Sequence, residues 1–313
     1  MHARVPRTLG VLVSGSETAA NGAAKTGPSP DVRSGVDVAG ALVALGHQPR
    51  VFDVGTTFDA HAIAREVDGC LVALHGPVGG SGLVHARMRS ASLGYAGPDP
   101  DRIATAYDKW NCREILQHHN VPVPASTLVP ATAPGPQQVP IRWPCVLKPR
   151  RASFGLGQVL VESAQALDEC IAKARRAGTQ ELVLERHVAG TEIQVVLLHG
   201  KVLGAMQLDD ELMSTPPSLS SIAQQGIYNL AQRAADRLGL HRGVCRVDVL
   251  LHPRDNEFIL EVEPLPPLHR ESVVNRVARA AGLGYRQLIE ELISVCHRQD
   301  RPGMAPTASL HAS

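Results

Sequence analysis

Three carboxylates in the last third of the chain have the type and spacing to hold a metal ion. Asp248 lies in the apolar run "CRVDVLL", and Glu261 and Glu263 lie in the next one, "ILEVEPLP". Residues two apart in a strand point to the same face, so Glu261 and Glu263 project together, and Asp248 joins them if the runs pair as a hairpin. Burying three carboxylates is costly unless a cation compensates them. Mg²⁺, or Mn²⁺ in its place, takes such oxygen ligands.

The opposing interpretation is that some of these acids face solvent, because antiparallel sheets often have one wet face. A second motif upstream favours the metal. In "PCVLKPRRASFGLGQVLV", Lys148 ends an apolar strand, and a loop with Gly155 and Gly157 leads into another strand. Glycines let backbone N–H groups approach a polyphosphate, and the lysine adds a positive charge. Glycine-rich hairpins are also common where no phosphate binds.

A third motif, "LVLERHVAGTEI", has Glu185 at the end of a strand and Glu192 after a turn. Such a segment can offer backbone groups to an adenine edge and a carboxylate to ribose hydroxyls. An ordinary strand–loop–strand with exposed acids would have the same pattern.

Strands and helices alternate in the part of the chain that precedes these motifs. Strands are expected at 8–13, 50–54 and 69–74, with a helix over 31–45 that ends at Gly46. This alternation predicts a parallel sheet with crossover helices. This first α/β domain is expected to end near residue 98.

The two following parts are expected to be α+β. The first has a helix over 101–119, short strands that form an antiparallel sheet, and a helix over 164–177 on one face. The second has strands at 192–198 and 201–207, a loop to residue 221, a helix over 222–238, the acid-bearing hairpin and a helix over 271–292. The predicted domains are 1–98, 99–189 and 190–298, with a flexible tail at 299–313.

Composition restricts the partners. The net charge of +1 over 313 residues has no basic excess, which argues against a nucleic acid partner. No apolar run reaches the roughly 18 residues of a membrane span, so no membrane partner is expected. Six scattered cysteines without a CxxC pair indicate buried free thiols in a cytoplasmic protein.

The order of these motifs resembles the ATP-grasp superfamily and, within it, the D-alanine–D-alanine ligases. "VALHGPVGGSG" and "AYDKWNCREILQHHNVPVP" resemble two family segments, and "CRVDVLL" and "LEVEPLP" match its metal-binding strands. The resemblance extends from residue 8 to about 292. It implies an α/β (α+β) fold: a three-domain ATP-grasp architecture, with a parallel α/β domain and two α+β domains that enclose the nucleotide.

The resemblance also implies residue roles, with ATP and Mg²⁺ as cofactors and a homodimer as the assembly. Lys109 and Lys148 match lysines on the ATP phosphates. The adenine positions are matched by Glu185, Arg186 and Val188, and the ribose position by Glu192. The phosphate loop is matched by Phe154 and Gly155, and the metal positions by Asp248, Glu261 and Glu263.

The family reaction phosphorylates a substrate carboxylate, and an amine then attacks the acyl phosphate. Arg246 would steady the acyl phosphate or oxyanion. His75 would contact the first amino acid, although a lone histidine is more often structural. Ser272 would meet the carboxylate of the second, or serve only as a helix N-cap.

The chain departs from the family where the amino acids bind. Glu263 replaces an asparagine, and Pro267 replaces a glycine whose N–H serves the oxyanion. Phe154 and Gly155 stand where the family has paired serines, and the stretch 207–222 lacks the family's tyrosine and lysine. The nearest candidates for the glutamate that grips the first ammonium are Glu17 and Asp31.

Three functions therefore stay open. The sequence favours a ligase for a non-standard amino acid. A genuine D-alanine–D-alanine ligase and a nucleotide-binding module without turnover are the alternatives.

Overall fold

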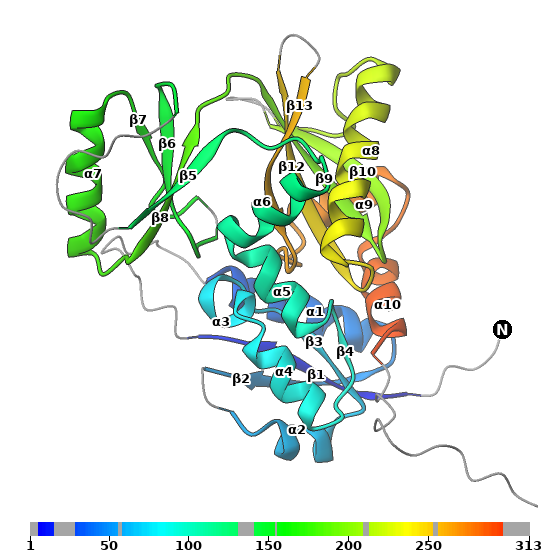
Figure 1. Cartoon of the computed structure of the whole chain (residues 1–313). Helices are drawn as coiled ribbons and strands as arrows, with labels where there is room; N and C mark the ends of the chain where they lie inside the picture. Colours follow the sequence, from blue (N-terminus) through cyan, green and yellow to red (C-terminus); the bar gives the residue numbers. More distant parts are fainter. Residues whose placement is uncertain are drawn as a thin grey trace, which may run out of the picture.

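The computed structural model describes residues 6–15, 29–55, 58–130, 141–153, 155–208, 213–252 and 256–296. Its three sheets follow one another along the chain (Figure 1). The predictions for Phe154 and for the tail at 299–313 lie outside the described residues.

The N-terminal sheet is parallel, as predicted, with strand order β2-β1-β3-β4. Its helix α1 (Pro30–Ala44) is followed by three short helices that the sequence patterns did not reveal: α2 (Ala60–Glu66), α3 (Gly76–Gly80) and α4 (Leu83–Ser90). The strands are β1 (Thr8–Val13), β2 (Gln48–Asp53), β3 (Gly69–Val72) and β4 (Tyr95–Ala96).

The central sheet is antiparallel, with order β5-β8-β6-β7. Its strands are β5 (Ser126–Pro130), β6 (Cys145–Pro149), β7 (Val159–Val161) and β8 (Glu181–Arg186). Leu147 and Leu184 point to one face, where they form a core with helix α7 (Ala164–Arg176). Because side chains alternate along a strand, Lys148 and Glu185 point to the opposite face.

The third sheet is also antiparallel, with order β11-β10-β9-β12-β13. The strands are β9 (Thr191–Leu198), β10 (Lys201–Leu208), β11 (Met213–Ser214), β12 (Val244–His252) and β13 (Asn256–Glu263), and helix α8 (Ser221–Leu238) packs on one face. The predicted hairpin is confirmed: Asp248 is opposite Glu261, and Arg246 is opposite Glu263, with a bulge after Asp248.

Two long helices predicted from the sequence are each broken into two. The expected helix over 101–119 is α5 (Pro100–Tyr107) and α6 (Lys109–His118), because Asp108 has extended backbone and its carboxylate caps α6. The expected helix over 271–292 is α9 (Val273–Ala280) and α10 (Tyr285–Ser294). Gly282, at φ +82°, ends α9 in a left-handed conformation that favours glycine.

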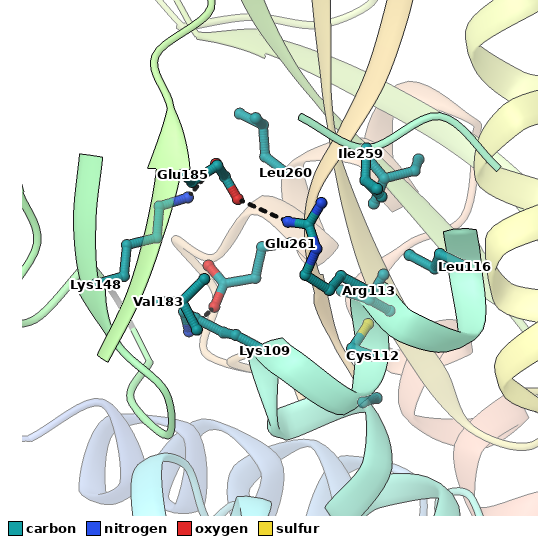
Figure 2. A pocket seen from close by; sticks show the side chains of 13 residues that line it. Lys109, Cys112, Arg113, Leu116, Lys148, Val183, Glu185, Ile259, Leu260 and Glu261 are labelled. Carbon is teal, nitrogen blue, oxygen red and sulfur yellow. Dashed lines mark hydrogen bonds and ion pairs between the residues drawn. The ribbon is translucent and has the colours of Figure 1, made fainter. Parts of the chain in front are cut away.

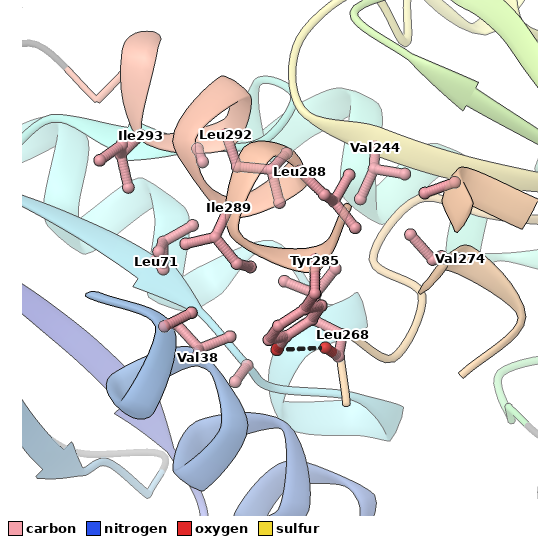
Figure 3. Packing of buried hydrophobic residues seen from close by; sticks show 14 of the residues in the cluster. Val38, Leu71, Val244, Leu268, Val274, Tyr285, Leu288, Ile289, Leu292 and Ile293 are labelled. Carbon is pink, nitrogen blue, oxygen red and sulfur yellow. Dashed lines mark hydrogen bonds between the residues drawn. The ribbon is translucent and has the colours of Figure 1, made fainter. Parts of the chain in front are cut away.

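Helix α10 joins the first and last parts of the chain in one core (Figure 3). Leu288 and Ile289 pack with Val38 of α1, and the same cluster includes Val244 of β12. The Tyr285 hydroxyl donates a hydrogen bond of 2.7 Å to the Leu268 carbonyl, which fixes the loop after the acid-bearing strand. No helix within the described ranges is long and apolar enough to cross a membrane.

Candidate active site

The three predicted metal-binding acids lie on the face of the third sheet opposite α8. Val247 and Val262 alternate with them and point into the core beneath α8. Asp248 and Glu263 are buried, at 5% and 6% exposure. The hairpin therefore places the three acids on one face, as the sequence predicted, and removes two of them from water.

Two cations compensate these acids in the structure. Arg246 donates two hydrogen bonds to Asp248, from Nε at 2.7 Å and from Nη2 at 2.9 Å. Lys109, the first residue of α6, places its Nζ 2.6 Å from Glu261 Oε1 and also donates to the Ala152 carbonyl. Arg246, predicted to bind the acyl phosphate, is thus paired with an acid of its own strand.

The compensation is incomplete, and the pKa values show where. Burial alone would raise the pKa of Glu261, but Lys109 and Arg246 outweigh it and hold the pKa below its usual range. Burial raises the pKa of Asp248 and of Glu263, and Arg246 offsets only part of that effect. Asp248 and Glu263 are therefore the acids whose charged forms the cations of the site do not fully stabilise.

This donor set fits a hard divalent cation, because it consists of carboxylate oxygens that lack full compensation. Among the described residues, no three His, Cys, Asp or Glu side chains already converge as a metal cluster. Lys109 and Arg246 hold two of the carboxylates instead. Side-chain rearrangement would have to accompany metal binding here.

Lys148 forms the other wall of the site (Figure 2). Its Nζ lies 2.8 Å from Glu185 Oε1, and Arg113 Nη1 lies 3.8 Å from Glu185 Oε2. Helix α6, strands β6 and β8, and strand β13 together enclose a pocket between Lys148 and Glu261. Lysines from two elements thus face the acid-bearing hairpin across one pocket.

The remaining nucleotide candidates are not among the residues that line this pocket. Gly155 is in the loop before β7, with φ +65°; apart from its chain neighbours, no described residue has an atom within 4 Å of where a Cβ would lie. Arg186 ends β8 with an exposed side chain, and Val188 is half-buried in the following loop. Glu192 lies on the acid face: burial and then Asp248 raise its pKa, and Gln194 donates to it at 3.3 Å.

The two substrate candidates already have partners within the protein. The backbone N–H of His75 donates to Asp31 Oδ1 at 3.1 Å, and its ring Nδ1 contacts the same oxygen. His75 also interacts electrostatically with Glu263, which brings it to the acid face. Ser272 is the N-cap of α9 and accepts from the Asn275 N–H at 3.3 Å, so the structure shows its capping role.

Sequence reasoning missed three polar residues of this region. Arg113, Gln194 and Tyr107 are buried there, and none was singled out. Arg113 had a usable signal, since it falls at the second basic position of the "DKWNCR" segment. Gln194 and Tyr107 had none, because a glutamine in a strand and a tyrosine ending a helix are ordinary.

Comparison with known proteins shows the family to which the chain belongs. Residues 206–294 match the family model described as "D-ala D-ala ligase C-terminus". A D-alanine–D-alanine ligase of Anaeromyxobacter sp. (strain Fw109-5) is 30% identical over 84% of this chain and 90% of its own length. One from Pseudomonas putida (strain GB-1) is 27% identical over 92% and 95%.

Among solved structures, the D-alanine–D-alanine ligase from Bacillus anthracis complexed with ATP superposes with a TM-score of 0.82. It is 19% identical, and the match covers 93% of this chain and 97% of that one. The ligase from Coxiella burnetii gives 0.79 at 16% identity, over 93% and 94%. The chain therefore belongs to the D-alanine–D-alanine ligase-like family of ATP-grasp enzymes and is a ligase that forms C–N bonds.

Proposed function

We propose that this enzyme uses ATP to join the carboxylate of one amino acid to the amine of another through an acyl phosphate. The observation that supports it is the pocket lined by Lys109 of α6, Lys148 of β6 and Glu261 of β13, with Asp248 opposite Glu261 on the neighbouring strand β12. Such a pocket offers positive groups to phosphates on one side and oxygen ligands to a cation on the other.

The chain's own residues would divide the work as follows. Lys109 and Lys148 bind the phosphates, and Phe154 and Gly155 are the candidates for the phosphate-loop positions. Glu185, Arg186 and Val188 hold the adenine, and Glu192 holds the ribose.

The remaining site residues would serve the metal and the amino acids. Asp248, Glu261 and Glu263 hold Mg²⁺ or Mn²⁺, which when bound neutralises phosphate charge. Arg246 faces the anionic oxygens of the acyl phosphate. His75 and Ser272 contact the two amino acids.

D-alanine is the first substrate to assign, because the named relatives are D-alanine–D-alanine ligases. A non-standard amino acid is the second candidate. The structure of Asp31 favours this second candidate. Asp31 is a candidate for binding the first ammonium, but it is 2% exposed and already hydrogen-bonded to His75. Pro267 also removes the N–H that the family directs at the oxyanion. The non-catalytic alternative is set aside, because the chain belongs to a ligase family.

Phosphate release from ATP and Mg²⁺, screened over D- and L-amino acids, tests the proposal. We expect release that depends on an added amino acid and that Glu261→Gln abolishes. Glu66→Gln is the control, since Glu66 forms an exposed ion pair with Arg50 away from the site. D-alanine alone supporting turnover selects the first candidate. The proposal would be contradicted if no D- or L-amino acid increased the release of phosphate.

Three further points are proposals on the same basis. The domains are 1–98, 99–189 and 190–298, the assembly is a homodimer, and the protein is cytoplasmic. Sedimentation of the purified protein tests the dimer.

A further inference from the structure

Tyr107 lies where the three parts of the chain meet. It is the last residue of α5, directly before the break at Asp108, and Lys109 follows as the first residue of α6. Its ring packs on α3: a Cβ on Gly80 would lie 2.3 Å from Tyr107 Cδ2, so residue 80 must be glycine for the ring to fit. Helix α5 also contacts β13, which carries Glu261 and Glu263.

The Tyr107 hydroxyl is buried and has no hydrogen-bond partner among the described residues. The residue as a whole is only 6% exposed. Leaving a buried donor unpaired is unfavourable, and native proteins rarely do so. Ser153, at the start of the glycine-containing loop, lies beside the hydroxyl, but the pair does not reach normal hydrogen-bond geometry. An unpaired donor between this loop and the acid-bearing strand needs an explanation.

The hydroxyl is a neutral donor at physiological pH. Burial raises the pKa of Tyr107 well above its usual value, and Glu263 and Glu261 raise it further. A neutral phenol donates most strongly to an anionic oxygen. Lys109, two residues later, is the residue assigned to the ATP phosphates, so a phosphate bound by Lys109 would lie within the same region.

We propose that Tyr107 donates a hydrogen bond to the terminal phosphate of the bound nucleotide. This inference rests on the proposed function. The Tyr107 hydroxyl would join Lys109 and Lys148, the donors already assigned to the phosphates. The proposed hydrogen bond also accounts for the unpaired hydroxyl, which the acceptor would satisfy only when the nucleotide is bound.

Calorimetric titration with MgATP and with MgADP, without amino acids, tests the assignment. Tyr107→Phe should weaken MgATP binding by about tenfold or more, the effect of losing a hydrogen bond to a charged group, and leave MgADP binding unchanged. Tyr95→Phe is the matched control. Tyr95 is also fully buried with an unpaired hydroxyl, but it packs on His85 in the N-terminal part, so both affinities should be unchanged.

A purely structural Tyr107 predicts a different result: Tyr107→Phe would melt at the same temperature or higher and bind both nucleotides as the wild type does. That result would overturn the assignment and leave the proposed function standing. A wild-type protein that binds neither nucleotide would overturn both. If Tyr107→Phe does not fold, the wild-type ultraviolet difference spectrum decides: a tyrosine perturbation with MgATP but not MgADP supports the assignment, and its absence contradicts it.

Discussion

Glu261 and Glu263 are two residues apart on one strand, yet their surroundings shift the pKa in opposite directions. Lys109 lies 2.6 Å from Glu261, and its charge outweighs the effect of burial. Glu263 is more deeply buried and lies farther from a cation. The effect of burial therefore dominates, and its pKa is raised. The charged form of Glu261 therefore stabilises the fold, whereas the charged form of Glu263 does not.

These directions fix the sign of two substitutions at pH 7. A raised folded pKa means that Glu263 opposes folding once the pH exceeds its ordinary value of 4.5. Glu263→Gln should therefore raise the free energy of unfolding of the metal-free protein by about 1 kcal/mol. Glu261 has a lowered pKa and stabilises the fold above pH 4.5. Glu261→Gln should cost up to about 3 kcal/mol, because it leaves Lys109 without its partner.

Urea unfolding of both variants, at pH 7 and at pH 4, measures the two effects. The loss in Glu261→Gln should shrink at pH 4, since a group with a lowered pKa loses its contribution as the pH falls through that pKa. A loss of stability in Glu263→Gln at pH 7 would show that its carboxylate is a structural group rather than an uncompensated one.

The residue types of the site could be predicted from the sequence, but their pairing could not. The spacing of Glu261 and Glu263 fixes a common face, because side chains in a strand alternate. Which cation reaches which acid depends on how α6 crosses β13, and nothing local in the sequence determines that crossing. Lys109 and Lys148 were therefore predicted as phosphate ligands, while their contacts with Glu261 and Glu185 were not.

At the scale of elements, Asp108 determines the direction of α6 and with it the position of Lys109. Its Oδ1 accepts from the backbone N–H groups of Trp110 and Asn111, which caps the helix. The same carboxylate pairs with Arg150 at 2.7 Å and with Arg151 at 2.8 Å. One buried side chain thus ends α5, starts α6 and ties both to the two arginines that directly follow the strand carrying Lys148.

Asp108→Ala should lower the free energy of unfolding by about 3 kcal/mol, because it removes a helix cap and one partner of a buried ion pair. Asp108→Asn keeps the cap and should cost less. Burial would raise the pKa of Asp108, but Arg150 and the helix N–H groups lower it below 3.8. Its contribution is therefore present above pH 3.8 and is lost as the pH falls through the lowered value.

Unfolding of both variants in urea at pH 7 and at pH 3 checks this account. Equal costs for the two substitutions would mean that the charge matters and the cap does not. The helix break itself was not predictable from periodicity, since the apolar positions of α5 and α6 continue across it. The signal was the capping residue Asp108, which also occurs inside ordinary helices.

At the scale of the whole molecule, the central sheet has a core of its own, while another cluster joins the first and last parts, each of which also has a cluster besides it. Every buried member of the central core falls within residues 129–184. The shared core joins Leu9 and Val38 to Leu288 and Ile289, residues about 280 and 250 positions apart. Figure 3 shows Val38, Leu288 and Ile289 in this core. Chain order suggested three consecutive units, and this long-range packing is the part that local patterns could not reveal.

Separate cores predict separate unfolding, with the central part the less stable because a core of this size supports little stability alone. Leu167, fully buried in the central core, and Leu288, fully buried in the core that joins the first and last parts, are matched probes. Each Leu→Ala substitution should cost about 2–5 kcal/mol. Leu167→Ala should shift only the transition of the central part, and Leu288→Ala only the other.

Trp143 packs against the central core, so in a Trp110→Phe background its fluorescence reports that part alone. Circular dichroism reports the whole chain. We expect the fluorescence midpoint in urea to lie below the main dichroism midpoint and MgATP to bring the two closer, because the nucleotide would bind across Lys148 on one part and Glu261 on another. Coincident transitions that both leucine substitutions shift equally would instead show that the pocket couples the two cores even without nucleotide. Lys148 and Glu261 would then be held at a fixed separation, and binding would not need to close the site.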